Sequence, residues 1–228
     1  ARIDIGVASK VDFANTTGTG RTLTLAGSST AGNAYGASLF DNAEAADRLF
    51  TSVVKEGVGA WVMRGTGDTF ASAATFDLTA GLLGFTTGAL GGVGHTGNIA
   101  VTSNAGLRWE AGNTDDLSAR LRVPAADVAN LVFADAAATV TFASPLTVGA
   151  SGTIYKSGEG KLVLAAANTF SLGGLEVRQG TVRVTADGGL GTGVERVLVR
   201  SAINPSAPTQ LIVDSLNVGA GVVASIIE

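Results

Sequence analysis

The sequence has 228 residues, of which 46% are hydrophobic but only 6% aromatic, and its net charge at pH 7 is −4. Its 32 glycines do not recur at every third position, which excludes collagen, and its many Val, Leu and Ile residues argue against disorder. The absence of a Lys/Arg run gives no support for nucleic-acid binding, and no apolar stretch predicts a membrane-spanning helix. Cysteine is absent, which slightly favours export through an oxidising compartment.

Short strands with one buried face are predicted along most of the chain. Residues 3–7 place Ile3, Ile5 and Val7 at alternate positions. The same alternation recurs in the runs 21–25, 138–142, 175–177 and 181–184. Gly, Asn, Ser or Asp residues bound each run, as expected for strands between tight turns.

Helix signals are sparse. Asp41 is a candidate N-cap for a helix over 41–54, because Glu44 follows three residues later and Leu49, Phe50 and Val53 give a partial apolar stripe. A short helical turn is also expected over 115–120. The remainder of the chain is predicted to be strand and turn.

An internal repeat is the most informative feature of the sequence. Residues 54–85 resemble residues 155–184, with Lys55 and Lys156 at equivalent positions 101 residues apart, and a partial copy lies at 18–27. Each full unit contains Lys-x-Gly-x-Gly, where glycine allows positive φ, and then an apolar triplet and Asn/Asp-Thr-Phe, which starts another turn. A unit of roughly 30 residues cannot bury its own apolar face, so neighbouring units must stack.

The sequence therefore predicts an all-β fold, a right-handed parallel β-helix that forms a single domain over residues 1–228. A β-sandwich is the structural alternative, because it also uses short alternating strands. The recurring Gly-x-Gly turns and the scarcity of aromatic residues favour the solenoid.

Residues 155–184 resemble the autotransporter passenger-associated β-strand repeat family. The positions on the family pattern are Lys156, Gly158, Gly160, Leu162, Leu164, Asn168, Thr169, Gly173, Gly174, Val177, Gly180, Thr181 and Val184. Phe170 stands where the family usually has Tyr, and Ala166 where it usually has Gly. The resemblance implies a parallel β-helix in the secreted or surface-exposed passenger region of a Gram-negative bacterial protein. It implies no particular activity.

Charged side chains that could perform chemistry are few. The densest cluster is formed by Asp115, Asp116, Arg120 and Arg122. Such a cluster is the feature to expect on the charged face of a β-helical polysaccharide lyase or hydrolase, although a solvated loop or a subunit contact is the simpler interpretation. His95, the single histidine, is expected to be a solvated loop residue.

The two tryptophans have two interpretations. Trp61 and Trp109 could stack on sugar rings, but padding of a solenoid core is the more frequent use. With one His, no Cys and no calcium-loop motif, the sequence predicts no metal, no cofactor and no catalytic residue.

The predicted function is that of an extracellular or cell-surface structural or adhesive module, and not that of an enzyme. Self-assembly end to end into filaments or a layer is expected to use the terminal segments, with Ile3, Ile5 and Val7 at one end and Val222, Val223, Ile226 and Ile227 at the other. The alternative is that both segments simply close rungs of their own solenoid. A carbohydrate-active or carbohydrate-binding β-helix, with surface glycans as partners, is the second functional hypothesis.

Overall fold

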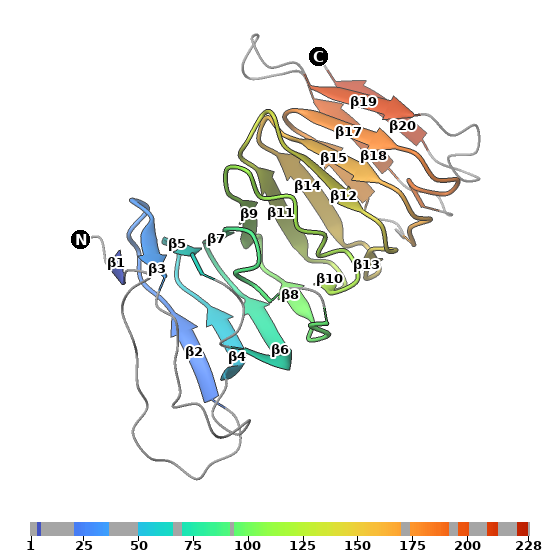
Figure 1. The fold of residues 1–228 in the computed structure, drawn as a ribbon. Helices are drawn as coiled ribbons and strands as arrows, with labels where there is room; N and C mark the ends of the chain where they lie inside the picture. The colour runs from blue at the N-terminus through green and yellow to red at the C-terminus, as the bar shows by residue number, and fades with distance from the viewer. Residues whose placement is uncertain are drawn as a thin grey trace.

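The computed structural model describes residues 4–5, 21–36, 50–65, 70–91, 94–169, 174–191, 196–200, 209–213 and 223–227. Over these ranges the chain forms strands and turns without a helix, and hence without one that is long and apolar enough to cross a membrane. Figure 1 shows an elongated stack of strands, with β1 (Asp4–Ile5) at one end and β20 (Val223–Ile227) at the other.

Every strand pairs in parallel with its neighbours, and the strands form three sheets. The long sheet contains, in spatial order, β1, β3 (Asn33–Tyr35), β5 (Ala60–Met63), β7 (Leu82–Phe85), β9 (Gly106–Trp109), β11 (Val128–Phe133), β14 (Thr153–Ser157), β16 (Gly174–Val177), β18 (Arg196–Arg200) and β20. The N-terminal side sheet contains β13 (Thr147–Val148), β10 (Leu121–Val123), β8 (Ile99–Val101), β6 (Phe70–Leu78), β4 (Phe50–Lys55) and β2 (Arg21–Leu25). The C-terminal side sheet contains β12 (Thr139–Phe142), β15 (Lys161–Leu164), β17 (Thr181–Val184) and β19 (Gln210–Val213).

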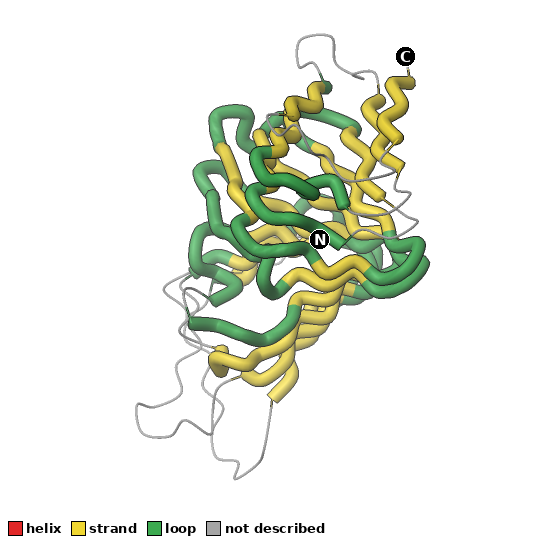
Figure 2. Tube along the Cα trace, turned by 90° about the vertical axis from the view of Figure 1, so that its right-hand side faces the viewer, coloured by secondary structure: helices red, strands yellow, loops and turns green. Residues whose placement is uncertain are grey.

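The chain winds as a solenoid, and one rung is the circuit from a strand of the long sheet to its next strand. Val62 of β5 pairs with Gly84 of β7, and Gly84 pairs in turn with Arg108 of β9, so these rungs take 22 and 24 residues. Figure 2 shows the strands of successive rungs superposed, with the loops projecting at the sides. The parallel β-solenoid is therefore as predicted, and the sandwich alternative, which needs antiparallel sheets, is wrong.

The long sheet changes its partner midway along the stack. Before residue 124 the chain passes in each described rung between the long sheet and the N-terminal side sheet. After residue 152 it passes between the long sheet and the C-terminal side sheet. The rung between them contributes β11, β12 and β13, one strand to each sheet. Because all three sheets meet in this rung, a single continuous core passes through the change.

An aromatic column fills the centre of the core. Phe85, Trp109 and Phe133 occupy one register position on consecutive strands of the long sheet, and Phe142 reaches them from β12. The ring centroids of Trp109 and Phe133 lie 4.7 Å apart in a stacked arrangement, and those of Phe85 and Trp109 lie 5.0 Å apart edge to face. All four side chains are fully buried, so large rings occupy the rungs where the sheets exchange.

The predicted strands at 21–25, 138–142, 175–177 and 181–184 are confirmed as β2, β12, β16 and β17. The helix predicted over 41–54 is wrong for residues 50–54, which belong to β4 and pair with strands on both sides; residues 41–49 lie outside the described ranges. Thr51, Val53 and Val54 are β-branched, and Val53 is fully buried, so strand packing outweighs the weak helical pattern. Over 115–120 a turn is present, in which the Leu117 carbonyl accepts from the backbone N–H of Arg120.

Candidate functional site

The Lys-x-Gly-x-Gly sequence forms a turn between strands of two different sheets, which we call a corner. A buried lysine binds the carbonyl oxygens of this turn. Lys156 has no exposed surface, and its Nζ donates to the carbonyl oxygens of Gly158 and Gly160, each at 2.6 Å. A third bond of 2.7 Å reaches the carbonyl of Gln179, which lies at the same corner one rung later. The lysine therefore binds its own corner and joins it to the next.

The equivalent lysine of the first repeat unit makes the same kind of corner. Nζ of Lys55 donates to the carbonyls of Glu56, Gly57 and Ala80 at 3.0, 2.7 and 2.9 Å, and Ala80 lies in the next rung. Burial lowers the pKa of the Lys55 ammonium, against the opposing effect of Glu56, and it lowers the pKa of Lys156 to about 7. A buried amine that binds three carbonyls has a structural role.

The two repeat units occupy different edges of the long sheet. The Lys55 corner joins β4 of the N-terminal side sheet to β5 of the long sheet. The Lys156 corner joins β14 of the long sheet to β15 of the C-terminal side sheet. The 101-residue spacing is thus the distance between two uses of one corner design, and not the length of a rung.

The predicted charged cluster partly comes together. Asp115, Asp116 and Arg120 line an open hollow of about 450 Å³ together with His95 and backbone of the loop after β7. Arg122 does not line this hollow; it lies on β10, where its Nη1 donates to the Leu121 carbonyl.

The charged side chains around the hollow bind backbone groups of neighbouring rungs. Oδ2 of Asp115 accepts the N–H of Gly88 at 2.7 Å, and Oδ2 of Asp116 accepts that of Ala143 at 2.9 Å. Arg120 is 6% exposed and donates to the carbonyls of Leu90 and Gly97, each at 2.8 Å. These groups therefore connect one rung to the next, which is a structural use of their charge.

Burial dominates the electrostatics of the hollow. It raises the pKa of the Asp115 carboxyl, although the bond from the Gly88 N–H acts in the opposite direction. It also lowers the pKa of the Arg120 guanidinium. Within the described ranges no group of three His, Asp or Glu side chains is placed to hold a metal ion.

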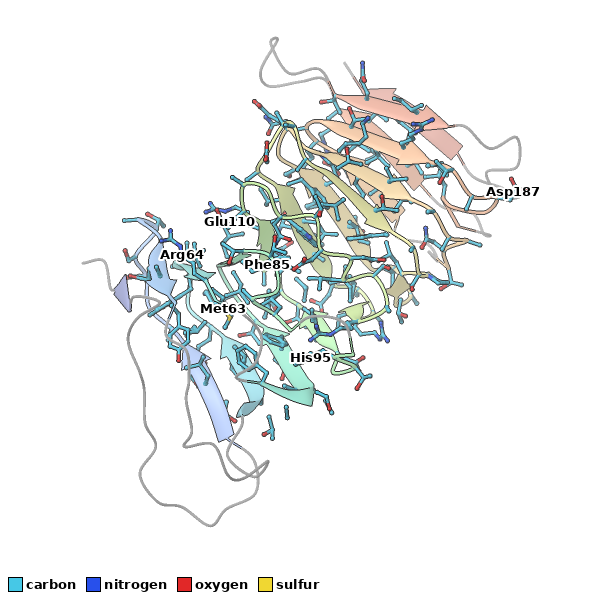
Figure 3. The ribbon with its side chains drawn as sticks, viewed as in Figure 1. Met63, Arg64, Phe85, His95, Glu110 and Asp187 are labelled. Atoms are coloured by element: carbon cyan, nitrogen blue, oxygen red, sulfur yellow. The ribbon has the colours of Figure 1, made fainter. Side chains whose placement is uncertain are left out.

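His95 is more enclosed than the sequence predicts. Its side chain is half-buried and packs on Gly91, where a Cβ would come within 2.5 Å of the ring Cγ. Figure 3 places it beside the loop that leads into β8. His95 lies in a loop, as predicted, but its imidazole is partly buried, because the absence of a side chain at Gly91 leaves room for the ring against the loop.

Both tryptophans belong to the core. Trp61 is 6% exposed and its Nε1 donates to the Ala26 carbonyl at 2.9 Å. Trp109 is 1% exposed and its Nε1 donates to the Asp115 carbonyl, also at 2.9 Å. Their interpretation as core padding is confirmed, and their rings are not available to stack on a sugar.

The predicted assembly segments lie at the two ends of the long sheet. Ile5 belongs to β1 and pairs with Tyr35, while Val223, Ile226 and Ile227 belong to β20 and pair with β18. Ile3, Val7 and Val222 lie outside the described residues. Among the described strands, β1 and β20 each pair on one side only. Both segments therefore do join the chain's own solenoid, as the simpler alternative has it.

Tyr155, Glu176, Arg178 and Arg200 form a cluster on the long sheet that was not predicted from the sequence. The available signal was Glu176-x-Arg178 in a strand, because residues two apart lie on one face. Arg108-x-Glu110 is a second pair of this kind. Figure 3 shows Glu110 near Phe85, and the backbone N–H of Glu110 donates to the Phe85 carbonyl at 3.1 Å.

No protein-family model, curated protein or solved structure matches this chain.

Proposed function

We propose that this chain is a structural β-solenoid module of a secreted or cell-surface protein of a Gram-negative bacterium, which extends as a rod and associates end to end with copies of itself. The observation that carries the proposal is the edge of the long sheet at β20. Among the described residues this strand has a partner only in β18. A parallel strand with one open edge can pair with a strand of another molecule.

The use of charge in the rungs also supports a structural role. Asp115, Asp116 and Arg120 each bind backbone of an adjacent rung, and the buried lysines do the same at the corners. Such bonds maintain the stack, whereas a catalytic side chain must be available to a substrate. The resemblance of residues 155–184 to the autotransporter-associated repeat agrees with a location outside the cell.

Self-association can be tested by sedimentation velocity over a wide range of protein concentration. A lysine in the middle of β20, in the variant Ser225→Lys, should suppress association, because charged side chains on an edge strand prevent pairing between molecules. Thr153→Lys adds the same charge to β14, which has partners on both sides, and should associate as the unchanged chain does. A single species at every concentration, or equal association of both variants, would refute association through this edge.

A carbohydrate-binding module is the second candidate function. The tryptophans do not support it, since both are buried. The pair of partly exposed arginines on the long sheet, Arg178 and Arg200, does support it.

A further inference from the structure

Two arginines occupy neighbouring positions on the outer face of the long sheet. Val177 of β16 pairs with Val199 of β18, and both are buried against the core. Arg178 and Arg200 follow them directly and therefore point away from the core, side by side on consecutive rungs. Like charges at adjacent strand positions are unfavourable, so this arrangement needs compensation.

Glu176 supplies the compensation. Its Oε1 accepts from Nε of Arg178 at 2.7 Å and from Nε of Arg200, and the residue is only 5% exposed. Burial by itself would raise the pKa of this carboxyl, but the N–H donors and positive charges of the two arginines outweigh it and hold the pKa below its usual value. One carboxylate thus binds two guanidinium groups, and the three side chains together carry one excess positive charge.

Both guanidinium groups are held in place while part of each stays available. The Cζ of Arg178 lies 3.4 Å from the ring centroid of Tyr155, so the guanidinium stacks on the phenol. Each arginine binds Glu176 through Nε, and no described residue accepts a bond from the Nη atoms of either. The Arg178 and Arg200 side chains are 36% and 47% exposed, so these donors face the solvent.

We propose that Arg178 and Arg200 form a binding site for a carboxylate group of an acidic surface glycan. Guanidinium donors that are already oriented bind a carboxylate at a lower entropic cost than mobile ones. The net charge of −4 repels a long polyanion, so the ligand carries isolated acidic groups on an otherwise neutral body. This inference does not depend on self-association of the chain.

The surroundings of the arginine pair favour a glycan over a protein partner. Thr153 and Ser157 lie on the same outer face of the long sheet, where hydroxyl groups suit a polyhydroxylated ligand. The centre of a protein interface is more apolar than its rim and is depleted in charged residues overall. Among the described residues the exposed large hydrophobic side chains are Val58 and Ile212, and neither belongs to the long sheet.

Isothermal titration of the full 228-residue chain at low ionic strength would test the site. The probes are a glucuronic-acid-containing oligosaccharide, the same oligosaccharide with its acids reduced to alcohols, and a glutamate-containing peptide of equal charge. The acidic oligosaccharide should bind at least tenfold more tightly than the other two. Equal binding of the reduced sugar would overturn the role of the carboxylate, and tighter binding of the peptide would overturn the glycan assignment.

Variants assign the binding to the arginine pair. Arg200→Gln should weaken binding of the acidic oligosaccharide at least tenfold without lowering the midpoint of urea unfolding greatly, because this side chain is half exposed. Arg108→Gln is the matched control: Arg108 is on the long sheet, but it pairs alone with Glu110 and adds no excess charge. Affinity that is unchanged in Arg200→Gln, or reduced equally in both variants, would contradict the proposal.

Discussion

The Nζ atom of Lys156 lies 2.7 Å from the carbonyl oxygen of Gln179, one rung further along the solenoid. Gly180, the next residue, has φ +69°, and a Cβ at this position would come within 2.5 Å of that Nζ and of the Gly158 carbonyl oxygen. The lysine can therefore bind the next rung only because this rung has a glycine at the corner.

Gly180→Ala should lower the free energy of unfolding by about 3 kcal/mol, since the new methyl group collides with the lysine cage and the backbone has positive φ. Gly112→Ala separates the two effects. Gly112 has a similar φ of +76°, but nothing lies within 4 Å of its potential Cβ, so about 1 kcal/mol is expected. Urea denaturation of both variants measures the difference, and equal losses would show that crowding at the lysine is unimportant.

The buried Lys156 should make stability depend on pH. Its pKa is about 7 in the folded chain and near 10.5 when unfolded, so the unfolded state binds more protons between these values. The free energy of unfolding should therefore rise with pH from about 7 to 10, by a few kcal/mol. Lys156→Met removes the titrating group and should lack this rise, whereas Lys161→Met, on β15, should retain it. Parallel pH profiles for the unchanged chain and Lys156→Met would contradict the prediction.

Ala126 is a site at which the chain can be stabilised. It is exposed and has φ +61°, a conformation that costs an L-residue energy but not glycine. Ala126→Gly should raise the free energy of unfolding by about 0.5–1 kcal/mol, since its backbone N–H can still donate to the Ala150 carbonyl. Thermal unfolding followed by circular dichroism would detect the gain. A lower midpoint of thermal unfolding in this variant would show that the positive φ of Ala126 does not strain the backbone.

Asn168 connects the end of the N-terminal side sheet to the next rung. It is 2% exposed, its Oδ1 accepts the Leu146 N–H at 2.8 Å and its Nδ2 donates to the Gly189 carbonyl at 2.5 Å. Asn168→Asp should cost about 2–4 kcal/mol at pH 7, because a buried carboxylate would face a carbonyl. The loss should shrink at pH 4, where the protonated carboxyl can donate. The exposed Asn98→Asp should cost little at either pH, and a loss for Asn168→Asp that is the same at both would point to another cause.

The strands could be predicted because their information is local. Period-2 runs such as 181–184 specify a strand with one buried face whatever surrounds them. The Lys55 and Lys156 corners have the same sequence pattern. The sequence therefore could not predict that they lie at different edges of the long sheet.

Contacts between rungs were equally inaccessible from the sequence. Asp116 binds Ala143, and Arg178 lies beside Arg200, only because particular rungs have particular lengths. Rung length varies from place to place, as the spacings of 22 and 24 residues on either side of Gly84 illustrate. A one-residue change in a loop would place different side chains together.

Negative-stain electron microscopy of the purified chain, at low and high protein concentration, tests the central claim most directly. End-to-end association through β20 predicts rods that lengthen into uniform filaments as concentration rises, and that stay short in Ser225→Lys. Rods of one fixed length at every concentration, or filaments that persist in Ser225→Lys, would contradict it.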